Sequence, residues 1–225
     1  HMNIEFSKRA ERFGSNIFNI LNEKKNDRLA QGKPVYNFTV GTPDFKPDES
    51  VMKVVSDAAL DPENYKYSLG DTDELLDAVC KWYKRRYNTV ITPDEVTSVF
   101  GTQEGMAHIA LALCNPGDLC LVPNPGYPIF EIGPFLCDAQ IAYYNLLPEN
   151  DYLIDFDSIN EDTAKRAKMM VVSYPLNPVC ATAPDEFYDK LIAFAKKYNI
   201  IIIHDNAYSE IIYDLSLIHI SEPTR

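Results

Sequence analysis

The stretch NIIIIHDNAYSEIIYD, residues 199–214, runs four isoleucines directly into a histidine and an acid. A short apolar run that ends in polar residues is typical of a strand covered on both faces of a sheet. We therefore predict a buried strand over residues 200–204. In open α/β sheets the functional groups lie just outside the carboxyl ends of the strands. Asp205, which follows this run, is accordingly the first candidate for a functional side chain.

The rest of the chain alternates between apolar runs and segments with one apolar helical face. The expected strands are continuous apolar runs at residues 35–40, 96–100, 119–122, 141–144 and 169–174. The expected helices show apolar side chains at helical spacing, in an N-terminal segment that ends near residue 31, from residue 71 onward, and at residues 103–113, 128–136 and 187–198. Strands and helices in succession predict the α/β class, with a doubly wound, mostly parallel sheet.

Two of these helices carry residues suited to begin them. Asp71, with Glu74 three residues later, resembles a capping box at the start of one helix. Thr182 and Asp185 are placed to cap the helix around residues 187–198.

Composition narrows the class of protein. The 225 residues carry a formal net charge of −12, which disfavours a nucleic-acid partner, because binding nucleic acid needs a basic surface. The five cysteines show no CxxC spacing, so we expect no metal site and reduced thiols in the cytoplasm. No apolar run approaches the length of a membrane span, so we expect no membrane association. His1 and Met2 are typical of an expression scar.

The expected strands deliver polar and aromatic residues at their carboxyl ends, in residues 101–103, 123–127, 174–177 and 205–208. Thr102 and Gln103 begin a helix, whose free backbone N–H groups and dipole favour an anion such as phosphate. The alternative is a plain strand-to-helix turn with Thr102 as N-cap.

Three further side chains have two interpretations each. Asp205 is either a buried acid that pairs with the cation of a ring nitrogen or an ordinary turn residue. Tyr127 either lays its ring over a flat ligand or packs beside the proline-rich turn before it. His204 is more readily explained as a core histidine than as a catalytic one.

Six segments in order carry a resemblance to a known family: GTPDF (41–45), NYKYSLG (64–70), FGTQEGMAH (100–108), PNPGYP (123–128), SYPLNPVCATA (173–183) and HDNAYSEI (204–211). Together they resemble the class I/II aminotransferases, which are pyridoxal-phosphate enzymes with the aspartate-aminotransferase fold. The resemblance covers roughly residues 6–214. It implies transfer of an amino group between an amino acid and a 2-oxo acid.

The resemblance also implies which residues bind the cofactor. Thr102 and Gln103 would hold the phosphate, and Tyr127 would stack on the pyridine ring. Asn177 and Tyr208 would hydrogen-bond the 3-oxygen of that ring. These roles are what the resemblance implies for matching positions of this sequence.

Three further roles follow from the same resemblance. Asp205 would pair with the protonated pyridine nitrogen, so that the ring can accept electrons when the α-proton of the substrate departs. Gly41 would approach the substrate carboxylate through its backbone. Tyr65 would reach the phosphate of the partner subunit, because this family builds its sites across a homodimer.

The sequence departs from the family in its last segment. Residues 206–225 contain no lysine, whereas the family forms its Schiff base on a lysine that lies further along the chain. The ending LSLIHISEPTR, residues 215–225, looks foreign to the family. We therefore expect an N-terminal half with no catalytic residue of its own and no efficient transamination. The expected parts are residues 1–46 as arm and part of the small domain, 47–214 as an incomplete large domain, and 215–225 as a tail.

Two structural and functional expectations remain open. The family places two further strands in the sheet, so we expect residues 96–100 either to pair directly with residues 169–174 or to leave a gap that another chain fills. The functional alternatives are a pyridoxal-phosphate carbon–sulfur β-lyase and a non-catalytic binding or assembly module. A cofactor titration separates the module from the enzymes, because a module without a cofactor site gives no spectral change.

Overall fold

The computed structural model describes residues 5–9, 17–39, 41 and 45–212. The chain divides into two compact units, His1–Gly70 and Asp71–Arg225. The division bears on where the expected site residues lie, because Gly41 and Tyr65 belong to the first unit and the others to the second.

The first unit contains helices and irregular segments. They are α1 (Ile17–Ala30), α2 (Glu49–Leu60) and the short 3₁₀ helix η2 (Pro62–Asn64). The expected N-terminal helix is confirmed as α1, whereas α2 was not predicted. The strand expected at residues 35–40 is wrong for residues 35–39, and residue 40 lies outside the described residues. A strand needs a neighbour to pair its backbone groups, and the described part of this unit holds no other strand.

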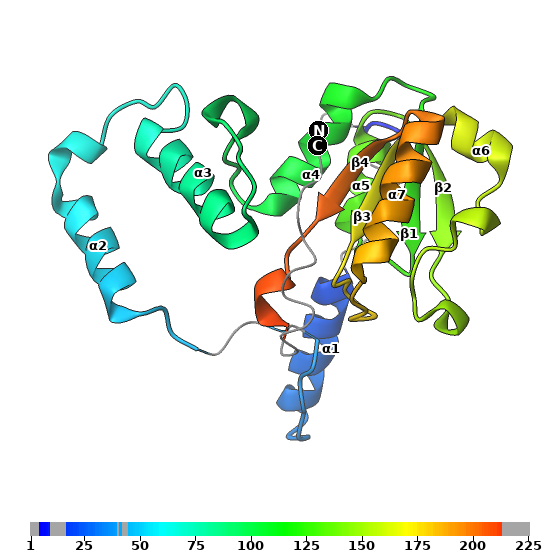
Figure 1. Ribbon diagram of the computed structural model, residues 1–225. Coiled ribbons are helices and arrows are strands. Elements are labelled where there is room, and N and C mark those ends of the chain that lie inside the picture. The colour runs from blue at the N-terminus through cyan, green and yellow to red at the C-terminus, as the bar shows by residue number, and fades with distance from the viewer. Residues whose placement is uncertain (1–4, 10–16, 40, 42–44, 213–225) are drawn as a thin grey trace. The chain divides into compact units, whose positions relative to one another are not determined.

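The second unit is built on a sheet of four parallel strands (Figure 1). They are β1 (Leu119–Asn124), β2 (Gln140–Asn145), β3 (Ala167–Ser173) and β4 (Ile201–Asp205). Their order in the sheet is β2-β1-β3-β4. The predicted α/β class with a parallel sheet is therefore confirmed. β4 carries the isoleucine run, yet its residues are only partly buried, because it lies at an edge of the described sheet.

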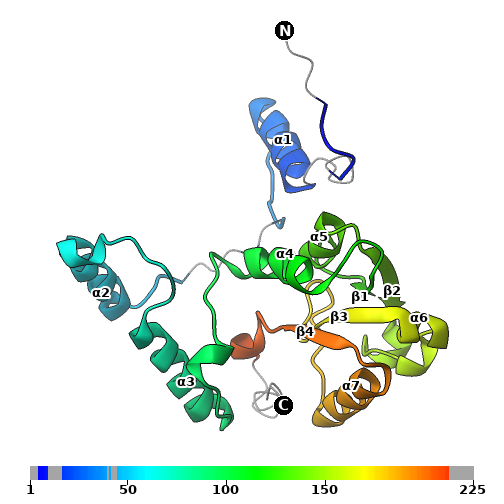
Figure 2. The same cartoon turned by 90° about the horizontal axis from the view of Figure 1, so that it is seen from above.

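Helices cover both faces of this sheet. Figure 2 shows α4 (Thr102–Leu113) and α5 (Ile129–Leu136) on one face and α7 (Asp185–Tyr198) on the other. The central strands β1 and β3 are almost entirely buried between these layers, as their continuous apolar sequences predict. The short helix α6 (Glu161–Arg166) leads into β3. The remaining 3₁₀ turns are η3 (Pro93–Glu95), η4 (Pro148–Asn150), η5 (Phe156–Ser158) and η6 (Ser209–Ile211).

Helix α7 buries its apolar stripe as the spacing predicts. Phe187, Leu191 and Phe194 are buried, and Phe156 packs its ring 5.2 Å from that of Phe194. The expected cap is wrong, because Pro184 precedes the helix and no side chain caps its first N–H groups.

Helix α3 (Asp73–Tyr87) begins differently from the predicted capping box. Thr72 is its N-cap, and its hydroxyl accepts a hydrogen bond from the Leu75 N–H at 3.3 Å. The carboxylate of Asp71 instead accepts a hydrogen bond from the backbone N–H of Ser98 at 2.8 Å. The prediction failed because a contact distant in sequence competes for the acid.

Residues 96–100 form no strand, so the predicted pairing with residues 169–174 is wrong. Strand β3 has β1 on one side and β4 on the other, which leaves it no free edge. The four described strands are neighbours without interruption, so the expected gap does not occur between them. Phe100, at the end of this segment, is fully exposed.

The packing of α5 on α4 depends on one glycine. A Cβ atom at Gly133 would lie 2.6 Å from the carbonyl oxygen of Met106 and 3.0 Å from the Cβ of Ala110. Both neighbours belong to α4, so the two helix backbones approach too closely for a side chain. Gly105, within α4, has only an ordinary contact of 3.5 Å with the side chain of Val99.

We predict that Gly133→Ala lowers the free energy of unfolding by about 1–3 kcal/mol, because backbone atoms must move to admit the methyl group. The matched control Gly105→Ala should be neutral or stabilising by up to about 1 kcal/mol, since alanine favours a helix over glycine. Urea unfolding of the two variants measures both values. Equal stability of Gly133→Ala and the wild type would contradict the close approach of α4 and α5.

Candidate functional site

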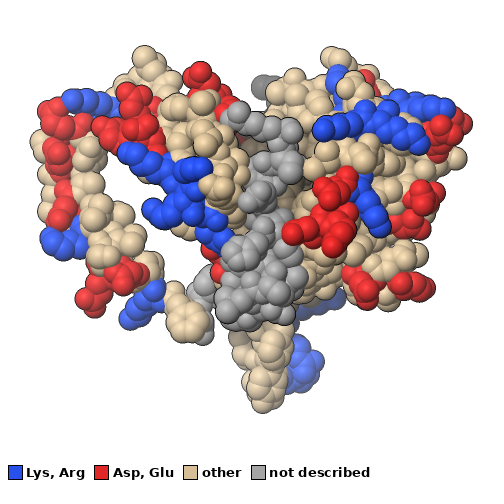
Figure 3. Space-filling model, viewed as in Figure 1, with Lys and Arg blue, Asp and Glu red and all other residues tan. Residues whose placement is uncertain are grey.

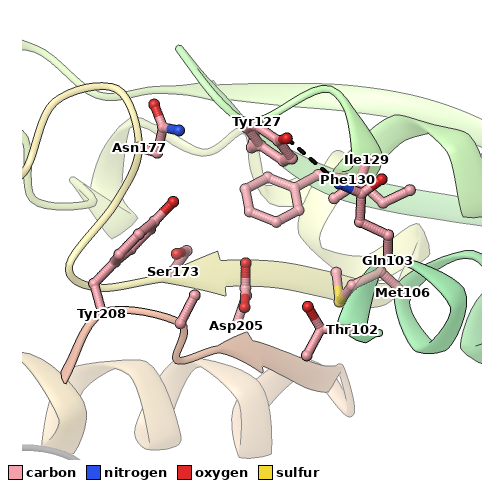
Figure 4. Close-up of a pocket in the computed structure, with 11 residues that line it drawn as sticks. Thr102, Gln103, Met106, Tyr127, Ile129, Phe130, Ser173, Asn177, Asp205 and Tyr208 are labelled. Carbon is pink, nitrogen blue, oxygen red and sulfur yellow. Dashed lines mark hydrogen bonds between the residues drawn. The ribbon is translucent and has the colours of Figure 1, made fainter. Parts of the chain in front are cut away.

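A pocket opens at the carboxyl ends of β3 and β4, where α4, the segment after β1 and the segment after β4 meet (Figure 4). The empty space in this pocket, open solvent included, is ≈ 530 Å³. Its lining consists of Thr102, Gln103, Met106, Tyr127, Ile129, Phe130, Ser173, Asn177, Asp205, Ala207 and Tyr208.

Asp205 supplies a carboxylate at the end of β4. It lies beside Ser173 in the register of β3 and β4, and Figure 4 shows its carboxyl group directed into the pocket. Burial raises the pKa of the Asp205 carboxyl, because the ionised form loses part of its hydration. No hydrogen bond or ion pair to this side chain occurs among the residues that the structure describes. The site therefore holds an acid that a cationic group would stabilise.

The start of α4 supplies hydrogen-bond donors. Gly101 precedes the helix with φ at 91°, a conformation that favours glycine, and no side chain caps the helix. The backbone N–H groups of Thr102 and Gln103 have no acceptor in the described part of the chain. Thr102 is the first helical residue, so its alternative interpretation as N-cap is wrong. Free amides at a helix N-terminus are suited to bind an anion.

Aromatic rings border the pocket between these two polar ends. Tyr127 follows the turn after β1, and its hydroxyl accepts a hydrogen bond from the Gln103 side chain at 3.4 Å. Its ring meets the edge of Phe130 at a centroid distance of 6.3 Å. Gly126 makes the turn possible, because a Cβ atom there would lie 2.5 Å from the carbonyl oxygen of Pro123. Figure 4 shows Tyr208 across the pocket, with its hydroxyl on the side of Asn177.

His204 is partly buried and is not part of the pocket lining. Its ring packs against Tyr188 at a centroid distance of 5.7 Å. Burial lowers the pKa of His204 to about 4, so the imidazole is neutral at neutral pH. Its Nε2 atom is buried without a hydrogen-bond partner in the described residues, as is the Oδ1 atom of Asn206. The interpretation as a core histidine therefore agrees with the structure.

The structure brings six of the predicted site residues to one pocket: Thr102, Gln103, Tyr127, Asn177, Asp205 and Tyr208. Gly41 and Tyr65 lie in the first unit, and both are exposed. The Tyr65 hydroxyl donates a hydrogen bond to the carbonyl oxygen of Ala59 at 2.6 Å. The roles assigned to these eight residues stay predictions.

Five lining residues were given no role from the sequence, although Ala207 lies within the candidate segment 205–208: Met106, Ile129, Phe130, Ser173 and Ala207. Ser173 could have been found, because it ends an apolar run as Asp205 does. The other four carry no polar signal, and only the packing of α4 and α5 against the strand ends brings Met106 and Phe130 to the pocket.

A helix start suited to bind an anion and an uncompensated acid, both at the carboxyl edge of a parallel sheet, are typical of ligand-binding α/β proteins. Residues 33–222 match the family described as Aminotransferase class I and II. LL-diaminopimelate aminotransferase of Aquifex aeolicus is 42% identical over 209 residues, which cover 92% of this chain and 54% of that protein.

Solved structures agree with this match. The substrate-bound structure of BacF from Bacillus subtilis has a TM-score of 0.89 at 32% identity, and the match covers 96% of this chain and 55% of BacF. A single mutant of Thermus thermophilus aspartate aminotransferase, at 24% identity, shares the fold with a TM-score of 0.86 over 94% of this chain and 56% of that one. The chain belongs to the class I and II aminotransferase family, and it spans about half the length of these relatives.

The family uses pyridoxal phosphate, and the pocket fits that cofactor. Free amides at the start of α4 suit its phosphate, and the uncompensated carboxylate of Asp205 suits a protonated ring nitrogen.

Two further observations concern the described residues alone. None of their helices combines the length and apolar character that a membrane span requires. No group of their His, Cys, Asp and Glu side chains is arranged to hold a metal ion.

The raised pKa of Asp205 predicts a dependence of stability on pH. The pKa of Asp205 in the folded state lies above its unfolded value of 3.8. Ionisation of this carboxyl therefore lowers the free energy of unfolding as the pH rises from the unfolded pKa to the folded pKa. Asp205→Asn should therefore stabilise the cofactor-free chain at pH 7, by less than about 1 kcal/mol because water screens the half-exposed group. The gain should vanish below the unfolded pKa.

Asp118→Asn is the matched control with the opposite sign. Hydrogen bonds from the Asn115 N–H and from Lys168 lower the pKa of Asp118, so its ionised form stabilises the fold above the unfolded pKa. This variant should lose stability at pH 7. Urea unfolding at pH 3 and pH 7 tests both, and a loss of stability in Asp205→Asn at pH 7 would contradict an uncompensated carboxylate.

Proposed function

We propose that this chain supplies the cofactor-binding part of a pyridoxal-phosphate-dependent aminotransferase. The observation that carries the proposal is the half-buried carboxylate of Asp205, which faces a pocket bordered at another side by the free amides of Thr102 and Gln103. A flat, phosphorylated heterocycle with a basic ring nitrogen complements both ends. Bound at this site, pyridoxal phosphate supplies an electron sink for the α-carbon of an amino acid.

The residues of the pocket have separate tasks in this proposal. The amides of Thr102 and Gln103 bind the phosphate dianion, which fixes the register of the ring. Asp205 holds a proton on the ring nitrogen, and its partial burial strengthens the attraction between the two charges. Tyr127 covers one face of the ring and excludes water from it.

Two hydrogen-bond donors complete the proposed set. The Asn177 amide and the Tyr208 hydroxyl line the pocket from segments that follow β3 and β4. Both donate to the 3-oxygen of the ring in this proposal, which favours the ionised form of that oxygen. Asp205 and Tyr208 thus act on two different atoms of one ring from a single segment of chain.

The longer protein, in this proposal, transfers an amino group between an amino acid and a 2-oxo acid. Several relatives bear the name LL-diaminopimelate aminotransferase, so an amino acid with amino and carboxylate groups at both ends is the first substrate to assay. Gly41 binds the substrate carboxylate, and Tyr65 reaches the phosphate in a partner subunit of a homodimer. In this proposal the Schiff base forms on a lysine that does not belong to residues 206–225, because that segment contains none. The free cysteines are compatible with a cytoplasmic protein.

Binding of pyridoxamine 5′-phosphate to the chain tests the proposal. This form of the cofactor has no aldehyde, so surface lysines cannot capture it. We predict saturable binding at one site, and Asp205→Asn should weaken it about tenfold or more, because the ring nitrogen loses a charged partner. Fluorescence titration or calorimetry measures the affinity.

Asp157→Asn is the matched control, because it makes the same chemical change in η5, away from the pocket lining. It should bind the cofactor as the wild type does. Absence of saturable binding to the wild-type chain, or equal affinity of Asp205→Asn and Asp157→Asn, would contradict the proposal.

A further inference from the structure

A cluster of three side chains joins the end of α3 to the turn that follows β4. We call it the Glu210 clamp, and it consists of Arg86, Tyr87 and Glu210. The Arg86 Nε–H donates to both carboxylate oxygens of Glu210, at 3.0 and 3.3 Å, and the Tyr87 hydroxyl donates to Oε1 at 3.2 Å. Figures 1 and 2 show η6, which carries Glu210, beside the end of α3.

The α3 side of the clamp is firmly held. Tyr87 is 8% exposed, and its ring meets the edge of Tyr83 at a centroid distance of 5.4 Å. The Arg86 guanidinium lies 5.1 Å from the centroid of the Tyr87 ring, and its side chain is only 16% exposed. Figure 3 shows basic side chains over the end of α3, where the helix dipole favours positive charge. Both donors are therefore packed against their own helix as well as bound to Glu210.

The other side of the clamp has little support of its own. After Asp205 the chain enters neither helix nor strand until the single turn η6 at Ser209. Among the described residues, one backbone hydrogen bond closes that turn, from the Ile211 N–H to the Tyr208 carbonyl oxygen at 3.1 Å. This short segment nevertheless contributes Ala207 and Tyr208 to the pocket.

We propose that Glu210 is a positioning residue for the pocket. By binding Arg86 and Tyr87, it fixes the turn at Ser209–Ile211 and so holds the Tyr208 ring at the pocket wall. Glu210 touches no ligand, because it is absent from the lining of the pocket. The inference rests on the proposed function for what Tyr208 does there, whereas the anchoring of the turn is a property of the chain alone.

Three variants test the clamp. Glu210→Gln keeps the shape and removes the charge, and Tyr87→Phe removes a single donor. Glu161→Gln is the matched control, because Glu161 pairs with Lys165 at 3.1 Å on the exposed surface of α6 and makes the same change of charge. All three should unfold within about 3 °C of the wild type, since the Glu210 side chain is half-exposed and glutamine keeps an oxygen that accepts from Arg86.

The first measurement is hydrogen exchange in the cofactor-free chain. Glu210→Gln should speed exchange of the amides of residues 207–211 about tenfold, and Tyr87→Phe should do so to a smaller extent. Exchange in Glu210→Gln equal to that in Glu161→Gln would overturn the clamp, whatever the cofactor does.

The second measurement is pyridoxamine 5′-phosphate binding with an absorbance titration of the bound ring. Glu210→Gln should bind about fivefold more weakly than Glu161→Gln, and the pKa of the 3-hydroxyl of the bound ring should rise, because Tyr208 no longer donates to it reliably. Faster exchange with unchanged affinity and unchanged ring pKa would overturn the positioning role. No binding by the wild type would instead remove the proposed function, and the positioning role with it, while leaving the exchange result to stand for the anchored turn.

Discussion

The carboxylate of Asp205 is held half-buried at the end of β4 without a counter-charge among the described residues, and this constraint governs the rest of the site. Partial burial raises the free energy of the ionised form, which a chain selected for stability alone would avoid. The cost is offset only when a cation enters the pocket. The backbone at Asp205 is fixed by pairing of β4 with β3, which is almost completely buried.

The parallel sheet brings Asp205 together with the other polar groups of the pocket. Parallel strands end at one edge, so β3 and β4 deliver Ser173 and Asp205 side by side. Helix α4 approaches the same edge with its uncapped N-terminus, and α5 holds it there through the close contact at Gly133. The carboxylate at the end of β4 and the free N–H donors at the start of α4 therefore border the same pocket. A ligand with an anionic group and a basic ring is complementary to the N–H donors and to the carboxylate.

Much of this arrangement can be predicted from the sequence, because its signals are local. Apolar runs mark β1, β3 and β4, and Asp205, which follows the last of these runs, lines the pocket. Several failures depend on contacts between residues that are distant in sequence. Residues 35–39 and 96–100 have strand-like composition but no partner strand among the described residues, so they stay irregular. Asp71 was predicted to cap α3, but it binds Ser98, which lies 27 residues away.

The clamp at Glu210 could not be predicted for the same reason. It joins residues 124 positions apart, and neither Arg86 nor Glu210 stands out in the sequence from other surface charges. The pocket lining from Met106 and Phe130 also depends on packing and not on any polar pattern. Candidate ligand-contacting residues are therefore easier to predict from sequence than residues that position other side chains.

The protonation state of the ring nitrogen tests the central claim most directly. It can be followed by nitrogen-15 NMR of pyridoxamine 5′-phosphate, labelled at the ring nitrogen and bound to the chain. We predict that the bound nitrogen stays protonated to a pH well above that at which the free compound loses this proton, and that Asp205→Asn abolishes the difference. A nitrogen that titrates in the wild-type complex as it does in free solution would contradict the pairing with Asp205.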